Sequence, residues 1–496
     1  MTSDRGPGSA PRRVAFRALE YRADQTVERV RLEFVGSEEE GWEVSRNGAP
    51  HLELGPGYRL LRCGSCGVCS TDLDRHFLPF PLPQVTGHEL IAFDDAGGRV
   101  VVEINASHLA RGVAGGLADP CPCCANGLET HCPERLVLGI HDLPGGFGAY
   151  VLAPARAIVP VPAAVPDDAA VLVEPFAAAL HAVRRSPPRD GDVVAVLGPR
   201  KLGSLVLAAL AAERRRLGRR FEIVALARRA ELRRLGLAMG ADRADAVPED
   251  GADADSGAPD LVFDTTASPE GLERALGLAR REVHLKSTHG RPACGLSHPT
   301  ELVVDEISLA PVPGEAAARD AWPGPAALGR GDGRPWIAWS SRAAVPDWIA
   351  AGSRVTDLRD AADALSKLEE QALPSELPRP DVVVVDSAAE VDRVLRPRPD
   401  VETALVRPRG EIWLAGGAGG GPIERAVVDR GVRLSTSRCG RFGEALALLA
   451  ADRGLCERLG RLVTHRFPAR RLADALSTAR SPAAIKAVVE HASPAS

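Results

Sequence analysis

From about residue 166 onward, short and fully apolar runs alternate with alanine-rich stretches that favour helix. Residues 193–197 form one such run, and a helical stretch at 202–216, a second run at 222–226 and a helical stretch at 229–239 follow. Strands this apolar are buried on both faces, and strands that alternate with helices form parallel β-α-β units. The pattern therefore predicts an α/β fold with a doubly wound parallel sheet.

The residues before this point have a different texture. Alternating apolar and polar runs at 14–19, 29–34 and 99–104 are broken by glycine and proline. Such runs are typical of antiparallel strands joined by loops. We therefore expect a mostly-β domain ahead of the doubly wound sheet.

Composition limits the kinds of function that the chain can have. Of its 496 residues, 45% are hydrophobic and 26% are charged, which is ordinary for a globular protein with a sizeable core. No apolar stretch approaches the roughly 18 residues of a membrane span. A net charge of −5 offers no basic surface for nucleic acid. We expect neither a membrane nor a nucleic acid as a partner.

The cysteines indicate metal binding. Seven of the ten lie between Cys63 and Cys132, in two tight clusters with no export signal ahead of them. In a reducing cytoplasm such clusters are more often metal ligands than disulfides. We therefore expect a cytoplasmic, metal-binding protein.

The first cluster runs into a motif that carries zinc-binding side chains. It reads Gly67-Val-Cys-Ser-Thr-Asp-Leu-Asp74, and Thr86-Gly-His-Glu-Leu90 follows shortly after. Zinc accepts thiolate, imidazole and carboxylate ligands, and a catalytic site needs three of them with one position left open. Asp72 is close enough in sequence to orient an imidazole through its free nitrogen.

Together with Val173-Glu-Pro-Phe-Ala177, these motifs resemble the zinc-dependent medium-chain dehydrogenase/reductase family, in its polyol and threonine dehydrogenase branch. The resemblance implies a catalytic zinc whose ligands are Cys69, His88, Glu89 and Glu174. It also places Thr71 at the hydroxyl position of the proton relay. Asp74 stands where some alcohol dehydrogenases carry a relay histidine, and His76 is a candidate substitute.

The second cluster, Cys121-Pro-Cys-Cys-Ala-Asn-Gly-Leu-Glu-Thr-His-Cys132, resembles the family's lobe for a structural zinc. That lobe spaces four cysteines by two, two and seven residues, and its last three positions match Cys121, Cys124 and Cys132. The first position would fall at Ala118, which cannot bind metal. Cys123 is an extra thiol, so four thiols remain, but the adjacent Cys123 and Cys124 cannot both follow the usual geometry. His108 is a spare candidate. A degenerate lobe without metal is the alternative.

A glycine-containing turn follows the strand expected at 193–197. It reads Gly198-Pro-Arg-Lys-Leu-Gly203, where a dinucleotide-binding fold has Gly-x-Gly-x-x-Gly between a strand and a helix. The first and third glycines are present, whereas Arg200 replaces the middle one and could either crowd the pyrophosphate or contact it. We expect this turn, including Lys201 and Leu202, to bind a nicotinamide cofactor.

The end of the next strand bears on the choice of cofactor. An NAD enzyme has an acidic residue there to bind the ribose 2′-hydroxyl, whereas this chain has Ala227 followed by Arg228 and Arg229. Guanidinium groups suit a 2′-phosphate, so NADP(H) is favoured over NAD(H). Two solvent-facing arginines without a ligand are the plainer alternative. Segments 264–268 and 284–290 resemble the family's strand ends beside the nicotinamide.

The resemblance also implies the domain organisation. It predicts a flexible tail, a GroES-like catalytic domain in two segments and a Rossmann cofactor domain, at 1–12, 13–178 with 443–496, and 179–442. An αβ block inserted at about 311–380 has no counterpart in the family. The family commonly joins its cofactor domains edge to edge into a homo-oligomer. The insertion adjoins the strand expected at 303–309, so it either covers that edge and leaves a monomer or builds a new interface.

Two segments in this region resemble earlier ones. Asp260-Leu-Val-Phe-Asp264 is similar to Asp381-Val-Val-Val-Val-Asp386, and Val303-Val-Asp-Glu-Ile-Ser-Leu309 is similar to Val427-Val-Asp-Arg-Gly-Val-Arg-Leu434. Either the second half of the sheet is partly duplicated or two strand patterns coincide by chance.

These features predict an oxidoreductase that transfers hydride between NAD(P) and a small alcohol or polyol, or the corresponding carbonyl. Glu174 favours a polyol, sugar or amino alcohol by resemblance. One alternative is a catalytically weak or inactive relative that serves as a nucleotide-binding or interaction module. Another is an NADP(H)-dependent lyase or epimerase.

Overall fold

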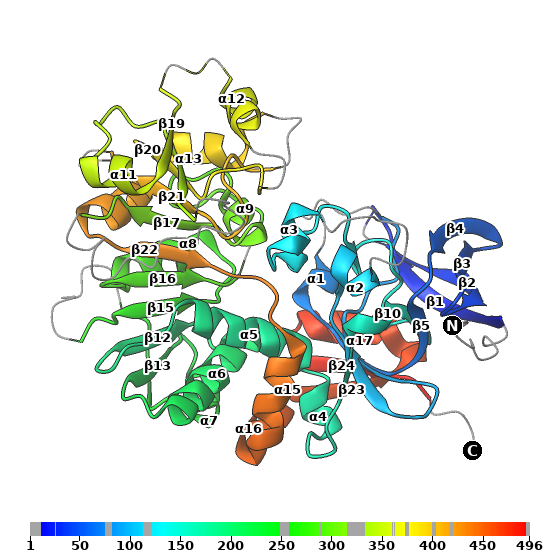
Figure 1. Cartoon of the computed structure of the whole chain (residues 1–496). Coiled ribbons are helices and arrows are strands. Elements are labelled where there is room, and N and C mark those ends of the chain that lie inside the picture. The colour runs from blue at the N-terminus through cyan, green and yellow to red at the C-terminus, as the bar shows by residue number, and fades with distance from the viewer. Residues whose placement is uncertain are drawn as a thin grey trace. The chain divides into compact units, whose positions relative to one another are not determined.

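A computed structural model describes residues 11–24, 26–74, 82–112, 121–248, 257–287, 289–314, 333–359, 361, 363–372, 376–398, 403–416 and 420–492. The chain divides into two compact units, Met1–Ala177 with Gly440–Ser496, and Ala178–Cys439 (Figure 1). Residues 1–10 of the expected tail lie outside the described residues, as do His76 and Ala118. Among the helices described, none combines the length and the apolar character needed to cross a membrane.

The first unit is built mainly from antiparallel strands, as the alternating runs predict. Four consecutive strands form one sheet in the order β1-β2-β3-β4, with bounds β1 (Arg12–Tyr21), β2 (Val27–Ser37), β3 (Gly41–Arg46) and β4 (Ala49–Leu54). A larger sheet has the order β11-β7-β6-β5-β24-β23, and β10 also pairs with β5. Its strands are β5 (Tyr58–Gly67), β6 (Glu89–Phe93), β7 (Arg99–Val102), β10 (Tyr150–Pro154), β11 (Ile158–Pro160), β23 (Val463–Pro468) and β24 (Lys486–Glu490). The last two strands join the sheet from the C-terminal segment, although the sequence pattern of that segment is mainly helical.

Short helices connect these strands. They are α1 (Ser70–Leu73), α2 (His108–Arg111), α3 (Pro122–Ala125), α4 (Asp167–Ala170), α15 (Phe442–Ala451), α16 (Arg453–Gly460) and α17 (Leu472–Arg480), with a small ladder of β8 (Asn105–Ala106) and β9 (Leu136–Val137). Helix α5 (Val173–Arg185) begins in the first unit and continues into the second.

The second unit contains one sheet of eleven strands, in the order β14-β13-β12-β15-β16-β22-β17-β21-β20-β18-β19. The strands from β14 to β22 are parallel to one another, and so are those from β17 to β19. The two halves run in opposite directions because β17 and β22 pair antiparallel, at Leu309 and Leu434. Figure 1 shows the labelled strands of this sheet, from β13 through β22 and β17 to β19, side by side in this order. The chain therefore contains the predicted doubly wound parallel sheet and a second parallel half beyond it.

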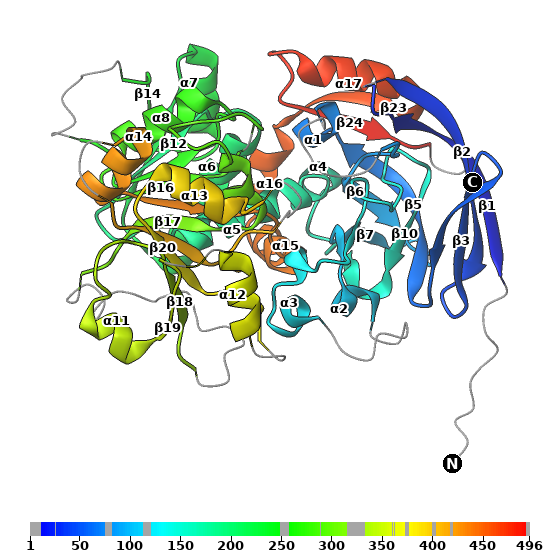
Figure 2. The same cartoon turned by 90° about the horizontal axis from the view of Figure 1, so that it is seen from above.

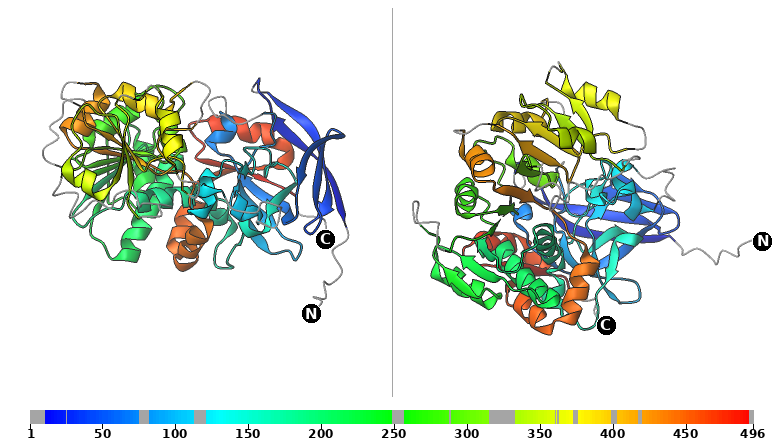
Figure 3. Two further views of the ribbon diagram at one scale, coloured as in Figure 1. Left: turned by 45° about the horizontal axis from the view of Figure 1, so that its top comes forward. Right: turned by 60° about the vertical axis from the view of Figure 1, so that its left-hand side comes forward.

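The strands of the first half are β12 (Val193–Leu197), β13 (Glu222–Leu226), β14 (Arg243–Asp245), β15 (Leu261–Asp264), β16 (Glu282–Leu285) and β22 (Arg433–Thr436). Those of the second half are β17 (Ser308–Pro311), β18 (Trp336–Trp339), β19 (Arg354–Asp357), β20 (Val382–Val385) and β21 (Glu411–Leu414). Helices lie on both faces of the sheet (Figures 2 and 3). They are α6 (Lys201–Leu217), α7 (Ala230–Ala238), α8 (Pro269–Leu278), α9 (Pro299–Val304), α11 (Asp347–Gly352), α12 (Ala364–Gln371), α13 (Ala388–Leu395) and α14 (Pro422–Glu424), which runs on into a π-helical turn at Arg425–Asp429.

The central strands are apolar because both of their faces are covered. All four valines of β20 are at most 1% exposed, and strands of both halves contribute to one apolar cluster. Fully burying such a side chain stabilises the fold by about 1.5–3 kcal/mol. The core therefore runs through both halves of the sheet.

The structure differs from the sequence pattern around residue 303. Helix α9 occupies Pro299–Val304, because a proline in the first turn suits a helix start, and strand β17 begins only at Ser308. This strand lies between β22 and β21 and is not an edge. The strands beyond β17 continue to Leu414, past the expected end of the insertion near residue 380.

Candidate functional site

The pairing of β5 with β6 brings the two zinc-type motifs of the first unit together. Gly67 at the end of β5 lies opposite Glu89 at the start of β6, so the residues that follow and precede these strands meet. Cys69 is the N-cap of α1, and His88 directly precedes β6. The ligand atoms of Cys69, His88 and Glu89 all lie within 4.8 Å of one another. A thiol, an imidazole and a carboxylate thus converge as a zinc site requires.

Asp72 ties the two ligand-bearing loops to each other. Its buried carboxylate accepts hydrogen bonds from the backbone N–H groups of Cys69 at 2.9 Å and Gly87 at 3.1 Å. The Nδ1 atom of His88 lies 3.7 Å from the same carboxylate. Burial raises the pKa of Asp72, against the opposing effect of His88. The Asp72 carboxylate therefore joins the two loops and lies beside the His88 imidazole.

Charge around His88 favours its protonated form. Burial works to lower the pKa of His88, but the charges of Asp72 and Cys69 outweigh it and hold that pKa well above its ordinary value. The buried Nδ1 has no hydrogen-bond partner among the described residues. The negative charges around His88 therefore favour a positive charge beside them, and a bound cation would be stabilised in the same way.

Lys486 is a further site residue that the sequence patterns do not reveal. It starts β24, which pairs with β5, and its ammonium lies 2.7 and 2.5 Å from the two carboxylate oxygens of Glu89. Both side chains are buried. Burial tends to lower the pKa of Lys486, yet Glu89, Cys69 and Glu174 together raise it. A lysine inside an apolar strand, in a chain with lysines only at 201, 286, 367 and 486, was the one available signal.

Thr71 and Glu174 border this group. The hydroxyl of Thr71, on α1, lies 3.7 Å from the Sγ atom of Cys69. Glu174 is in the first turn of α5, and its carboxylate acts electrostatically on His88 and Lys486. It does not belong to the closest group of ligand atoms. Of the four expected zinc ligands, Cys69, His88 and Glu89 thus converge, whereas Glu174 lies outside their group.

Two glycines are required for this packing. A Cβ atom on Gly67 would lie 2.3 Å from a carboxylate oxygen of Glu89. Gly87 has φ +100°, and a Cβ there would lie 2.8 Å from the backbone nitrogen of Phe147. Glycine at 67 therefore lets the chain approach the Glu89 carboxylate closely, and glycine at 87 lets it approach the backbone of Phe147.

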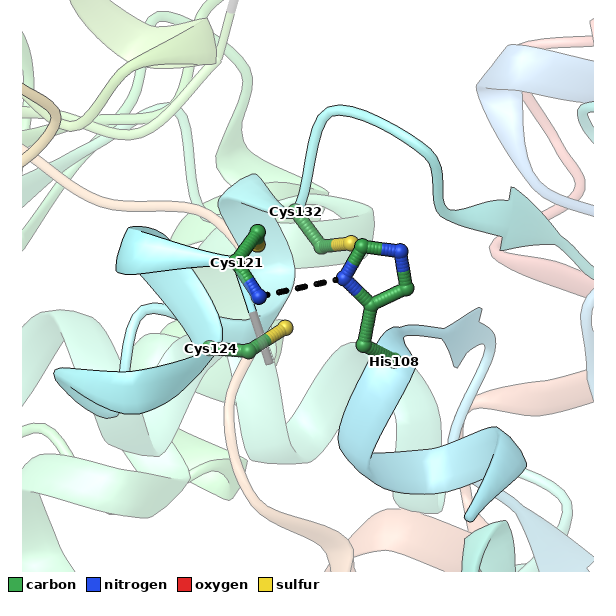
Figure 4. Close-up of side chains that lie close together, drawn as sticks. All are labelled: His108, Cys121, Cys124 and Cys132. Carbon is green, nitrogen blue, oxygen red and sulfur yellow. Dashed lines mark hydrogen bonds between the residues drawn. The ribbon is translucent and has the colours of Figure 1, made fainter. Parts of the chain in front are cut away.

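A second group of ligand atoms lies elsewhere in the first unit and consists of His108, Cys121, Cys124 and Cys132 (Figure 4). Cys123, which was expected to complete the set, lies outside this group, and His108 from α2 supplies the fourth atom. Neighbouring residues on a helix point in different directions, so Cys123 and Cys124 of α3 cannot both face one ion. The Nδ1 atom of His108 faces the cluster, 3.4 Å from the Cys121 nitrogen, and Nε2 is 2.9 Å from a Glu134 oxygen.

Two thiols of this group, those of Cys124 and Cys132, are buried, and that of Cys121 is partly exposed. Burial raises the pKa of Cys124 to about 12 and also raises that of Cys132. Thiolates are the form that binds zinc, and a cation among three sulfurs would offset the cost of burying their charge. The group therefore has the composition of a closed site with one nitrogen and three sulfur ligands.

In the second unit, the turn after β12 has the shape of a dinucleotide-binding loop. Gly198 has φ +86°, and a Cβ on Gly203 would lie 2.5 Å from the oxygen of Gly198 and from the Thr265 hydroxyl. Both glycines are thus required. Arg200 takes the middle position with φ −101° as the N-cap of α6, and its N–H bonds to the Gly198 oxygen at 2.7 Å. Lys201 and Leu202 open the helix.

Two arginines at this end of the sheet are close enough to affect each other. Burial lowers the pKa of Arg200, and the charge of Arg229 lowers it further. Arg229 is the N-cap of α7, at the end of β13, and Arg228 beside it is exposed. Guanidinium groups that repel one another favour an anion between them. Strands β13 and β12 end here, next to the point where the strand order reverses, which is where such sheets bind ligands.

The segments at 264–268 and 284–290 both begin with a buried polar side chain. The carboxylate of Asp264 is buried at the end of β15, and burial raises its pKa to about 6. His284 is fully buried between the hydroxyls of Ser186 at 2.7 Å and Ser437 at 2.8 Å. Its imidazole is thus held inside the sheet by protein groups. Neither residue faces solvent.

Comparison with known proteins agrees with this geometry. Residues 55–163 match the alcohol dehydrogenase GroES-like domain. The chain is 32% identical over 162 residues to L-galactonate-5-dehydrogenase of Escherichia coli, which covers 32% of this chain and 46% of the relative. The matched domain and the named relatives support the zinc-dependent medium-chain dehydrogenase/reductase family. It spans about half the length of the curated relatives it matches.

Solved structures of two dehydrogenases share the fold. L-idonate 5-dehydrogenase from Escherichia coli superposes with a TM-score of 0.56 at 16% identity, covering 97% of this chain and all of that one. A zinc-binding dehydrogenase from Sinorhizobium meliloti bound to NADP gives a TM-score of 0.52 at 18% identity, with 96% and 99% covered. The predicted combination of a GroES-like domain and a Rossmann sheet is confirmed.

Proposed function

We propose that this chain is a zinc-dependent oxidoreductase that transfers hydride between NADP(H) and a polyol, sugar or amino alcohol, or the corresponding carbonyl. The convergence of the Cys69, His88 and Glu89 ligand atoms within 4.8 Å carries the proposal. The similarity to a galactonate dehydrogenase supports a substrate with several hydroxyl groups.

The residues present fit a zinc ion. The donor set combines sulfur, nitrogen and oxygen, and the buried Nδ1 of His88 lies near Asp72, as the outer nitrogen of a zinc-bound imidazole commonly lies near a carboxylate. When bound, zinc supplies a Lewis acid for the substrate oxygen. Cys69 and His88 would hold it, and Asp72 keeps the imidazole oriented. Lys486 balances the charge of Glu89, whose carboxylate would be the third ligand.

Thr71 is the candidate for proton transfer from the substrate hydroxyl. Its own hydroxyl lies 3.7 Å from the Cys69 sulfur and is partly exposed. A hydroxyl both donates and accepts, so it can pass a proton outward without holding a charge. Asp74 caps the same short helix and follows Thr71 toward solvent.

The second unit would hold the cofactor. The Gly198 turn and the start of α6 suit a pyrophosphate, because a helix N-terminus attracts anions. Arg200 and Arg229 would bind a 2′-phosphate, which supports NADP(H) over NAD(H). The Rossmann-type fold shared with the NADP-bound structure supports the same placement.

The group formed by His108, Cys121, Cys124 and Cys132 would bind a second, structural zinc. All four positions are protein ligands, so no site remains open for substrate. Glu134 would accept the hydrogen bond of the outer His108 nitrogen and fix its ring. This ion would stabilise the lobe that α2 and α3 form.

Elemental analysis combined with an activity screen tests the catalytic site. Cys69→Ser should lose one zinc per chain and the NADPH-linked oxidation of polyols, measured by NADPH fluorescence. Cys456→Ser is the matched control, because Cys456 is a buried thiol whose sulfur bonds to the Leu449 oxygen. A zinc content that Cys69→Ser leaves unchanged would defeat the proposal. Zinc without any nucleotide binding would instead favour a non-catalytic module.

A further inference from the structure

The strands beyond β17 repeat the framework of the first half of the sheet. In the first half Val194 pairs with Leu261 and Leu261 with Glu282, and in the second half Ile337 pairs with Val382 and Val382 with Glu411. The outer strands β13 and β19 pair with β12 and β18 in the same parallel sense. Strands β12, β13, β15 and β16 thus correspond to β18, β19, β20 and β21.

Polar contacts at the start of the strands are repeated as well. Asp260 accepts a hydrogen bond from the Val193 nitrogen at 2.9 Å, and Asp381 accepts one from the Trp336 nitrogen at 2.8 Å. Each of these aspartates also pairs with an arginine that precedes the next strand, Arg280 or Arg407. Both following helices have a serine N-cap, Ser268 and Ser387. Agreement in register, ion pair and cap makes a chance coincidence of strand patterns untenable.

The two halves exchange their sixth strands. Strand β22 pairs in parallel with β16 of the first half, with Arg433 opposite Glu282. Strand β17 pairs in parallel with β21 of the second half, with Ser308 opposite Glu411. The exchanged strands then meet antiparallel at Leu309 and Leu434, both fully buried. This is the arrangement of a two-fold symmetric dimer, formed within one chain.

Glu306, a residue with a strained backbone, connects the two halves of the sheet near the pairing of β17 with β22. Glu306 precedes β17 with φ +53°, where the corresponding position before β22 is Gly431 with φ +69°. Its buried carboxylate accepts hydrogen bonds from His181 at 3.0 Å, from the backbone of Arg438 at 2.7 Å and from the Arg409 side chain. These three donors come from both halves of the sheet, which explains a glutamate where the backbone favours glycine.

The second half does not repeat the nucleotide turn. Beyond β18, the carboxylate of Asp386 accepts hydrogen bonds from the Ser341 hydroxyl at 2.5 Å and the Arg342 nitrogen at 2.8 Å. A negative charge thus occupies the donors that a phosphate would need. The duplicated strands keep the architecture of the sheet, but in the described turn after β18 protein groups take the place that a phosphate would need.

We propose that the strands β18 to β21 are a built-in second subunit. Through β21 they pair with β17, which would otherwise be the edge of the sheet and offer unpaired N–H and C=O groups to a second copy of the chain. The cofactor sheet therefore closes on itself as an internal dimer and does not associate with another chain through this junction.

Sedimentation of the full chain and its junction variants tests this. Leu309→Ala and Leu434→Ala weaken the crossing, and Leu272→Ala, on α8, is an equally buried control. We expect the protein to sediment as a single chain of 52.3 kDa. If it forms an assembly, the junction variants should change its dissociation constant no more than the control variant does. An assembly that both junction variants dissociate, and the control does not, would overturn the proposal. Leu309→Val serves where the alanine variants do not fold, and circular dichroism verifies folding.

Discussion

Replacing Lys486 with methionine removes a buried ammonium from the first unit while keeping most of the side-chain volume. The Nζ atom lies 2.5 and 2.7 Å from the Glu89 oxygens, and the two side chains are 7% and 1% exposed, so solvent cannot take over the charge. Breaking one partner of a buried ion pair costs about 3–5 kcal/mol, because the other charge is left uncompensated. We expect the free energy of unfolding of the metal-free Lys486→Met protein to fall by about this amount.

Zinc should restore most of that loss. Glu89 belongs to the same group of ligand atoms as Cys69 and His88, so a bound ion would neutralise its carboxylate when the lysine is gone. Calorimetry with and without zinc measures the difference, and it resolves the unfolding of the two units. Lys367→Met is the control, because the Lys367 ammonium donates to the Asp357 carbonyl in the second unit. Equal destabilisation with and without zinc would show that Glu89 does not reach the metal.

Three further predictions concern other residues. Burial raises the pKa of Asp264 to about 6, so the folded chain holds this proton more tightly than the unfolded chain does. The free energy of unfolding should therefore fall by about 3 kcal/mol as pH rises from about 4 to about 6. Asp264→Asn should remove that slope in urea denaturation, and an unchanged slope would contradict the assignment. His108→Ala should lose one zinc per chain by elemental analysis and Cys123→Ser none, whereas the reverse result would return Cys123 to the ligand set. Arg200→Gly should weaken NADPH binding by about tenfold in a fluorescence titration, equal to about 1.4 kcal/mol, and leave NADH binding unchanged. Equal weakening of both cofactors would refute a contact with the 2′-phosphate.

The zinc-type residues could be predicted because local chain geometry places them. Cys69 caps the helix after β5 and His88 precedes β6, and one antiparallel pairing brings them together. The glycines at 198 and 203 are predictable for the same reason, since a tight turn between a strand and a helix has few backbone solutions. Short-range patterns were sufficient for these features.

Long-range contacts could not be predicted in this way. Lys486 is 397 residues from Glu89 in sequence, and no periodicity relates a strand residue to a partner so far away. The sequence named both Cys123 and His108 for the second cluster, and only the fold, which brings α2 to the cysteines, selects His108. Strands β17 and β22 follow similar sequence segments, so local pattern does not decide which neighbour each one joins. The exchange depends on the pairing of the whole sheet.

The exchanged strands also bear on how the chain acquires its structure. Strand β16 receives its neighbour β22 only after all of the second half has been synthesised, because Glu282 pairs with Arg433. Strand β5 of the first unit similarly waits for β24, since Gly67 pairs with Val488. Contacts this distant in sequence give a high contact order and slow folding. During translation both sheets therefore stay incomplete until their last strands have been synthesised. Their unpaired strand edges are available to chaperones for that time.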